Sequence, residues 1–327
     1  LADDRRDELL DRVHRKARET TAEREPLIVF EGNAPSDIAG NRLLSRLLAA
    51  PSWPVTSAAP QAWLGDAVAI KDPTSVAFRR QSGSNLLMVG QRDEASLAMM
   101  ASAMVSLAAQ QPPRSARFII LDGSPADAPW AGHLQRVASI LPHTTRIVEY
   151  RELGEAMTEL ADELQRRQQG EVTASDASIY LMIYGLQRYR PLRRQEDDFS
   201  FSQTDENAPP DPGRQLSELL REGPHNGIHT LVWADTPVTL DRTFNRQSMR
   251  EFDNRVLFQM SAADSSNLID SPAANRLGLY RALLHSEELG LFEQFRPYAM
   301  LQSSWLEYVE NRFRLMSSAA GHEAAQQ

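Results

Sequence analysis

Short apolar runs alternate with longer amphipathic stretches along most of this chain, as strands alternate with helices in an α/β protein. Six predominantly apolar runs predict buried strands, at residues 85–90, 117–122, 145–149, 179–183, 227–233 and 255–260. Stretches with helical spacing follow at residues 94–110, 152–168 and 215–221. This alternation predicts βαβ units, and therefore an α/β fold with a mostly parallel sheet and helices on both faces.

The first fifty residues show a different arrangement. Residues 1–25 are charged and predict an exposed connecting helix. The apolar run at residues 26–30 predicts a short strand, and Ser36 with Asp37 is expected to cap a helix that ends near residue 50.

Turn-forming and polar segments suggest where the chain divides. Residues 51–61 are rich in Pro, Ala and Ser and predict a linker, followed by a hairpin or edge strand at residues 63–70. We therefore expect an N-terminal appendage over residues 1–60 and a main domain over residues 61–327. Residues 193–213 are acidic and Pro-rich, which predicts a mobile loop inside this domain.

Composition narrows the class of protein. The 327 residues are 42% hydrophobic, but no apolar run is long enough to span a membrane, and the N-terminus lacks the apolar core of a signal peptide. The chain has no cysteine, which excludes disulfides and thiolate metal sites and fits a cytoplasmic location. A net charge of -9 is unfavourable for non-specific DNA binding by the whole chain. The first residue is Leu1 and not Met, which we interpret as a fragment or a trimmed chain.

The first candidate for chemistry is the connection after the strand at residues 85–90. A strand, Gly90 and a helix follow one another as in a phosphate-binding loop. The working motif, Gly-x-x-x-x-Gly-Lys-Ser/Thr, uses its lysine on the phosphates and its hydroxyl on magnesium. Here Ala95 stands at the second glycine, Ser96 at the lysine and Leu97 at the hydroxyl position. Read by itself, this segment also fits an ordinary strand–turn–helix connection.

The charges in this connection oppose a phosphate ligand. Asp93 and Glu94 place two carboxylates where phosphates would lie. Lys16 and Lys71 are the only lysines of the chain, and Lys71 lies upstream of the strand, where it is no evident substitute. Arg92 is the nearby cation that could contact a phosphate.

Later segments, in order, resemble the FtsK/SpoIIIE family of hexameric DNA-pumping motors. The similar segments cover roughly residues 62–300 and lie at 86–97, 179–185, 227–237, 254–260, 264–270 and 276–279. The most specific part is Gly227-Ile228-His229 with its strand, followed by Asn254-Arg255 and by Asp264-Ser265. The resemblance implies a RecA-like P-loop NTPase fold.

The same resemblance implies that the groups for hydrolysis are missing. Tyr184 matches the Walker B aspartate and Gly185 the catalytic glutamate, while Asp235 matches the glutamine that senses the γ-phosphate. Phosphoryl transfer depends on positioning and charge stabilisation by such groups. The resemblance thus implies a pseudo-ATPase, with neither ATP nor Mg²⁺ as an expected cofactor.

We therefore expect a catalytically inactive domain that serves as a scaffold or partner-docking module in a larger DNA-translocating or secretion motor. This is similar to the inactive later domains of multi-ATPase type VII secretion motors. The implied partners are an active ATPase domain or a sister subunit, in a ring. Two alternatives stay open: a DNA-contacting translocase subunit, and a domain that still binds ATP through unusual contacts.

Two groups of arginines are further candidates. Arg255, which matches the family's Asn-Arg pair, and Arg250 could serve a neighbouring active site in trans, although such residues are often solvated or at the edge of a core. Arg188, Arg190, Arg193 and Arg194 surround Tyr189, and an aromatic among cations is typical of nucleic-acid contacts. An acidic run follows at once, so a solvated loop base is the alternative.

Overall fold

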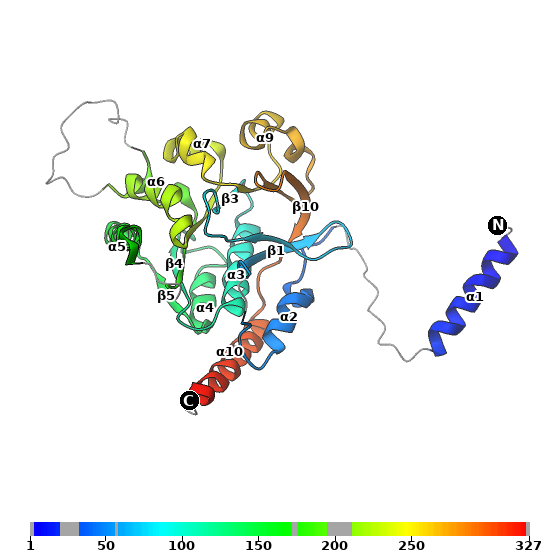
Figure 1. Cartoon of the computed structure of the whole chain (residues 1–327). Helices are drawn as coiled ribbons and strands as arrows, with labels where there is room; N and C mark the ends of the chain where they lie inside the picture. Colours follow the sequence, from blue (N-terminus) through cyan, green and yellow to red (C-terminus); the bar gives the residue numbers. More distant parts are fainter. Residues whose placement is uncertain (1–2, 20–32, 56–57, 172–175, 195–210, 325–327) are drawn as a thin grey trace. The chain divides into compact units, whose positions relative to one another are not determined.

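The computed structural model describes residues 3–19, 33–55, 58–171, 176–194 and 211–324 (Figure 1). The chain divides into two compact units, Leu1–Gly32 and Asn33–Gln327. In the first unit, helix α1 (Asp3–Glu19) is described, and its residues 5–16 are all exposed, in agreement with the expected exposed helix. The strand predicted at residues 26–30 lies outside the described residues. In the second unit, Leu44, Leu48 and Trp53 from the expected appendage pack in the main core.

The second unit is built on a ten-stranded sheet in the order β2-β1-β10-β9-β8-β3-β7-β6-β4-β5. From β8 to β5 neighbouring strands are parallel, and from β2 to β8 they are antiparallel. The strands are β1 (Gln61–Ala67), β2 (Thr74–Ala77), β3 (Leu86–Val89), β4 (Ala116–Asp122), β5 (Thr144–Ile147), β6 (Ser178–Tyr184), β7 (Ile228–Ala234), β8 (Asn254–Leu257), β9 (Ala282–Ser286) and β10 (Leu291–Pro297). The expected α/β class with a mostly parallel sheet is confirmed.

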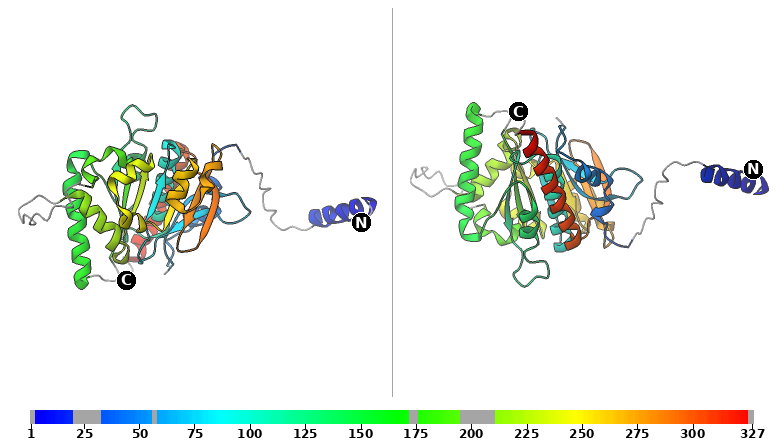
Figure 2. Two further views of the ribbon diagram at one scale, coloured as in Figure 1. Left: turned by 90° about the horizontal axis from the view of Figure 1, so that it is seen from above. Right: turned by 90° about the horizontal axis from the view of Figure 1, so that it is seen from below.

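Helices cover both faces of this sheet (Figure 2). They are α2 (Arg42–Ala49), α3 (Asp93–Gln110), α4 (His133–Ile140), α5 (Leu153–Arg166), α6 (Pro212–Glu222), α7 (Pro237–Thr243), α8 (Arg246–Arg250), α9 (Ala262–Ile269) and α10 (Ser303–Ala324). Leu86 and Met88 of β3 pack with α2, α3, α4 and α10, whereas Leu87 and Val89 pack with α5, α6 and α9. Because successive side chains of a strand point to opposite faces, an uninterrupted apolar run is what a sheet covered on both faces requires.

The antiparallel part of the sheet consists of two hairpins. Strands β1 and β2 pair as the hairpin expected near residues 63–70, but β1 lies inside the sheet and β2 is at its edge. Strands β9 and β10 form the second hairpin, which the sequence pattern did not predict. Lys71 Nζ contacts Glu293 Oε2 at 2.6 Å, and Thr74 Oγ1 donates to the same carboxylate, which fastens the first hairpin to β10.

Two helix starts differ from the expected ones. Ser36 and Asp37 do not cap α2: the backbone of Ser36 bonds to Pro297 and Ala299, and Asp37 caps a single turn at Ile38–Gly40. Asn41 caps α2 instead, its Oδ1 accepting from the N–H of Leu44 at 3.0 Å. Helix α6 begins at Pro212, before the expected residue 215, because proline suits the first helical turn and Asp211 supplies the cap. Residues 195–210 of the expected mobile loop lie outside the described residues.

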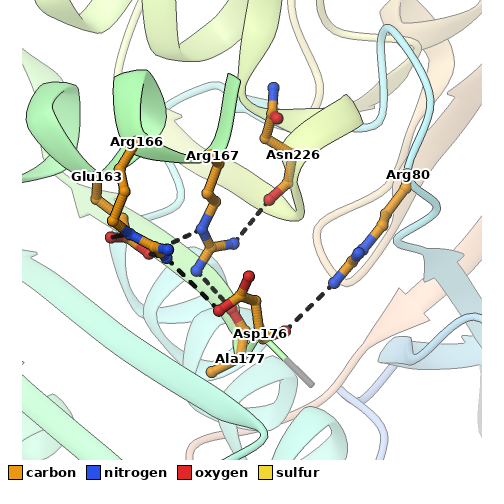
Figure 3. Close-up of polar contacts among 7 residues, drawn as sticks. All are labelled: Arg80, Glu163, Arg166, Arg167, Asp176, Ala177 and Asn226. Carbon is orange, nitrogen blue, oxygen red and sulfur yellow. Dashed lines mark hydrogen bonds and ion pairs between the residues drawn. The ribbon is translucent and has the colours of Figure 1, made fainter. Parts of the chain in front are cut away.

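Arg167 joins the end of α5 to the N-terminal ends of β6 and β7 (Figure 3). Its Nε donates to Glu163 Oε1 at 2.8 Å, and its other nitrogens donate to the carbonyls of Asn226 at 2.7 Å and Ala177 at 2.9 Å. Arg166 bonds to both oxygens of Glu163 at 2.8 and 2.9 Å. These bonds from Arg166 and Arg167 lower the pKa of Glu163 to about 2. A charged network thus attaches the end of α5 to the N-terminal ends of β6 and β7.

Candidate functional site

Gly90 directly follows β3 and begins the three-residue connection to α3. Its φ is +130°, and a Cβ there would lie 2.9 Å from the Cβ of Phe258, so glycine is required by the backbone and by packing. The Gly90 N–H donates to the Ala234 carbonyl at 3.1 Å, and the Gly90 carbonyl accepts from the Arg92 N–H at 2.9 Å. The backbone of Gly90 is therefore already bonded within the protein.

The three altered motif positions all lie in the first turns of α3. This helix begins at Asp93, so Ala95, Ser96 and Leu97 are helical. Ser96 and Leu97 are completely buried, and Ala95 is half-buried against the same core. Core packing thus accounts for a small residue at 96 and an apolar residue at 97.

Charged residues surround the start of α3. Arg92 is half-buried and makes no side-chain cap on the helix. Asp93 and Glu94 occupy the first turn, where a carboxylate stabilises a helix through its dipole. The end of a helix that commonly receives an anion is here supplied with carboxylates from the chain itself.

An aromatic pair lies beside this loop. Tyr184 ends β6 and stacks on Trp233 of β7, with ring centroids 4.6 Å apart and ring planes 23° apart. The Tyr184 hydroxyl donates to the Asp93 carbonyl at 3.1 Å, and Trp233 Nε1 donates to the Gly90 carbonyl at 3.0 Å. Burial raises the pKa of Tyr184, and the nearby Asp93 and Asp122 carboxylates raise it further, so its phenol is neutral. Both rings are therefore bonded to the connection between β3 and α3.

Gly185 follows Tyr184 where two strand ends approach closely. Its φ is +82°. The Gly123 N–H, just after β4, donates to the Tyr184 carbonyl at 2.8 Å, and a Cβ on Gly123 would lie 2.5 Å from that oxygen. Glycines at this point allow the ends of β4 and β6 to pack together.

Asp235, which the sequence analysis matched to a sensor glutamine, is hydrogen-bonded to the start of α7. Its Oδ1 accepts from the hydroxyls of Thr239 at 2.7 Å and Thr236 at 3.2 Å. Its N–H lies 3.4 Å from Gln187 Oε1. The carboxylate is thus part of a local hydroxyl network at the end of β7.

The two candidate trans arginines are in different environments. Arg255 donates to three carbonyls, of Leu268 at 2.7 Å, Met249 at 2.9 Å and Phe252 at 3.0 Å, and its side chain is 13% exposed. Burial lowers the pKa of Arg255. Arg250, at the end of α8, is exposed.

The candidate nucleic-acid arginines lie after β6, in two single turns at Leu186–Arg188 and Arg190–Leu192 and in the residues that follow. Arg188, Arg190 and Arg194 are exposed. Arg193 is half-buried and donates to the Gln187 carbonyl at 3.3 Å. Tyr189 is buried, so the aromatic that the sequence placed among them does not face solvent.

A cavity of about 420 Å³ opens beside the connection. Its lining comes from residues 91–95, Trp130, Phe258, residues 279–281 and residues 297–300. A neighbouring hollow of about 410 Å³ is lined by residues 35–39, residues 299–302, Trp305 and Tyr308. Both are lined by Pro35, Ala299 and Met300. The sequence analysis named residues 92–95 of this lining but missed residues 279–281 and 297–300, which belong to no motif and adjoin the unpredicted β9–β10 hairpin.

Other kinds of site are not found in the described part of the chain. Within it, no cluster of three or more His, Asp or Glu side chains could hold a metal ion. No described helix is long and apolar enough to cross a membrane.

Comparison with solved structures identifies the fold. The chain is similar to the cytoplasmic domain of the type VII secretion ATPase EccC of Thermomonospora curvata (TM-score 0.59, 13% identity, 86% of this chain and 34% of that one). It is also similar to the pCW3 conjugation coupling protein TcpA with ATPγS (TM-score 0.56, 12% identity, 81% and 74%). A third match is ATPases 2 and 3 of T. curvata EccC in complex with a signal sequence peptide (TM-score 0.55, 15% identity, 90% and 53%).

These matches concern three-dimensional structure. No protein-family model and no curated protein matches the sequence. The chain spans about a third of the EccC cytoplasmic domain and about half of the two-ATPase EccC structure. Together with the sheet order and the strand–Gly90–helix connection, the matches show that this chain has the RecA-like P-loop fold of FtsK-like secretion and conjugation ATPases.

Proposed function

We propose that this chain is a catalytically inactive FtsK-like ATPase domain that acts as a scaffold or partner-docking module in a larger secretion or DNA-translocating motor. Similarity to secretion and conjugation ATPases supports the motor context. Two of the similar structures contain more than this one domain, and one is named for ATPases 2 and 3, which supports an active ATPase domain as the partner. The EccC structure is a cytoplasmic domain, and we propose the same location for this chain.

One observation carries the proposed loss of hydrolysis. Tyr184 occupies the position expected to hold magnesium, and its ring and that of Trp233 are both hydrogen-bonded to the connection from β3 to α3. A neutral phenol and an indole offer no carboxylate to a metal ion or to an attacking water. Buried Ser96 and Leu97 likewise offer no cation or exposed hydroxyl to a phosphate.

The cavity beside the connection supports the docking part of the proposal. It combines apolar walls, such as Trp130, Phe258 and Leu279, with charged residues on its rim, as binding sites commonly do. Leu279 is 52% exposed and so presents apolar surface at this cavity. One EccC structure holds a signal sequence peptide, which supports a polypeptide segment as the class of occupant.

A nucleotide-binding experiment tests the proposal. Thermal unfolding of the chain is recorded with and without millimolar Mg-ATP and a non-hydrolysable analogue, and phosphate release is measured in parallel. We expect neither a rise in melting temperature nor phosphate release, because a ligand stabilises a protein only by binding its native state. Phosphate release above the buffer blank would overturn the proposal.

One observation favours the alternative of retained ATP binding: a cavity of about 420 Å³ lies beside the connection from β3 to α3. Arg92 lines this cavity and is the cation nearest to the altered motif. A rise in melting temperature with both nucleotides that disappears in Arg92→Ala, without phosphate release, would favour a nucleotide sensor over a docking module. A rise that persists in this variant would place the nucleotide elsewhere.

A further inference from the structure

Residues 33–37, at the start of the second unit, form a narrow strap that is attached to the end of β10. The Ser36 N–H donates to the Pro297 carbonyl at 2.9 Å, and the Ala299 N–H donates to the Ser36 carbonyl at 2.7 Å. The Ser36 hydroxyl donates to the Arg296 carbonyl at 2.9 Å. Each of these bonds is made by the same residue of the strap.

The sequence limits this pairing to an isolated bridge between Ser36 and Tyr298. A parallel ladder extended towards the start of the chain would next need an N–H from Pro297, which proline lacks. In the other direction the chain turns away at once, because Asp37 caps a single helical turn. Within the strap, all of whose residues are described, Ser36 alone is buried, with 2% exposed. The strap is therefore held at one point.

Two carboxylates come near each other when the strap is closed. Asp37 belongs to the strap, and Asp66 lies on β1 opposite Arg296 of β10. Burial raises the pKa of Asp66, Arg296 opposes this effect, and the charge of Asp37 raises the pKa further. The Asp66 N–H reaches the Ser36 hydroxyl at 3.3 Å, which is a long hydrogen bond. The repulsion between the carboxylates weakens the closed position, and this long bond adds little to it.

The strap borders both the cavity beside the connection and the neighbouring hollow. Pro35 lines both of them, and Ser36 and Asp37 also line the hollow. Ala299 and Met300 are the other residues that line both. Because Ala299 is bonded to Ser36, release of Ser36 separates the strap from the wall that the cavity and the hollow share. Opening of the strap therefore joins the two spaces.

We infer that residues 33–37 are a strap, latched by Ser36, that opens without unfolding of the sheet and joins the cavity and the hollow into one groove. An opening that breaks few buried contacts needs less free energy than global unfolding. The strap continues directly from residue 32, so a pull on the preceding chain acts first on Ser36. Control of partner binding by the strap rests on the proposed docking role, whereas the opening itself does not.

Hydrogen exchange at single amides of the whole chain, followed by NMR, tests the opening. We expect the Ser36 and Ala299 amides to show one common protection factor, smaller than that of amides in β3 and β7 and nearly independent of added urea. Ser36→Ala removes the hydroxyl and its bonds, so the Ala299 amide should exchange about 2- to 12-fold faster, with β3 and β7 unchanged. Ser304→Ala removes an exposed serine that lines the hollow and should leave all these rates unchanged.

A thiol probe tests the joining of the two spaces. The chain has no cysteine, so Ala299→Cys carries a unique thiol on their shared wall. Labelling of this thiol by a bulky maleimide should become faster by about the same 2- to 12-fold when Ser36→Ala is added. Exchange of the Ala299 amide as slow as that of β3, or either rate unchanged by Ser36→Ala, would overturn the inference. ATP hydrolysis by the chain would contradict the proposed function but would leave both measurements unaffected.

Discussion

Arg255 illustrates at the scale of one residue how a motif position can be used for structure. Its guanidinium joins the carbonyls of Met249, Phe252 and Leu268, which belong to the segments on either side of β8. Arginine suits this position because its planar group presents several donors in a fixed geometry. A guanidinium bonded in this way is poorly placed to act on a neighbouring subunit.

Replacement of Arg255 separates the structural role from a role in trans. Arg255→Met leaves three carbonyls without their donor, so we expect the free energy of unfolding to fall by roughly 2–4 kcal/mol in urea denaturation. Arg250→Met, at an exposed position, should stay within about 0.5 kcal/mol of the parent chain. If both variants unfolded like the parent, the guanidinium of Arg255 would be free for a partner.

His229 is a second buried polar residue, and it predicts a loss of stability in acid. Its Nδ1 lies 2.8 Å from the Ser84 carbonyl, and burial lowers its pKa to about 4, with the charges of Arg80 and Arg167 acting in the same direction. The unfolded state binds the proton more tightly than the folded state does. The contribution of His229 to the free energy of unfolding is therefore fully present above pH 6.5. It is lost as the pH falls from 6.5 towards 4, and the total loss is roughly 3 kcal/mol.

The measurement is urea denaturation at a series of pH values, on the parent chain and on His229→Asn. The variant cannot titrate at this position, so its stability should fall less steeply between pH 6.5 and 4. His225→Asn, which removes an exposed histidine, should follow the parent curve. Parallel curves for the parent chain and His229→Asn would show that His229 does not titrate in this range.

The candidate site was predictable in part at this scale. The sequence singled out residues 95, 96, 97 and 184 as predicted departures from a motif, and the structure places them in the first turns of α3 and at the end of β6. Contacts across the sheet could not be predicted, because Trp233 reaches Gly90 through the pairing of β3 with β7 and those residues are far apart in sequence. Tyr189 was expected at the surface because its neighbours are charged, whereas its own ring packs in the core.

At the scale of elements, Arg167 shows how one helix end is attached to the sheet. Its side chain is 2% exposed and bonds the last turn of α5 to residues just before β6 and β7. Arg166 shares Glu163 with it but is 37% exposed. The buried member of this network should therefore contribute much more to the stability of the fold than the exposed one.

We expect Arg167→Met to lower the free energy of unfolding by roughly 3–5 kcal/mol, because breaking a buried ion pair leaves its partner and two carbonyls unsatisfied. Arg166→Met should have a much smaller effect, because water can replace its contacts. Urea denaturation of both variants beside the parent chain provides the comparison. Equal losses in the two variants would contradict the assignment of this attachment to Arg167.

Elements of the parallel part were easier to predict than those of the antiparallel part. Strands β3, β6 and β7 are buried on both faces, so their apolar runs are continuous and distinct from the helices between them. Strand β10 carries Glu293 and Arg296 within seven residues, and one of its two partners, β1, lies far away in sequence. An alternating pattern this short is ambiguous until the pairing is known.

At the scale of the whole molecule, the N-terminal and the C-terminal ends of the parallel strands have different properties. Charged and aromatic networks around Arg167 and His229 hold the N-terminal ends of the parallel strands. The connection at Gly90 and the cavity beside it lie at the C-terminal ends of these strands. Ligand sites of open α/β sheets lie at the C-terminal ends of their strands, which is consistent with a binding role for this cavity.

The division into two units leads to a prediction about folding. Unit Asn33–Gln327 contains both core clusters, and residues 5–16 of α1 are exposed along their whole length. Because both core clusters lie within unit Asn33–Gln327, the chain without residues 1–32 should unfold with nearly the same midpoint and the same denaturant dependence. Removal of residues 1–50 is the matched comparison, since it also deletes Leu44 and Leu48, two fully buried leucines of α2. This longer truncation should lower the free energy of unfolding by several kcal/mol.

A large loss on the first truncation would mean that residues 1–32 contribute to the stability of the domain, whereas equal stability of both truncated chains would exclude α2 from the cooperative core.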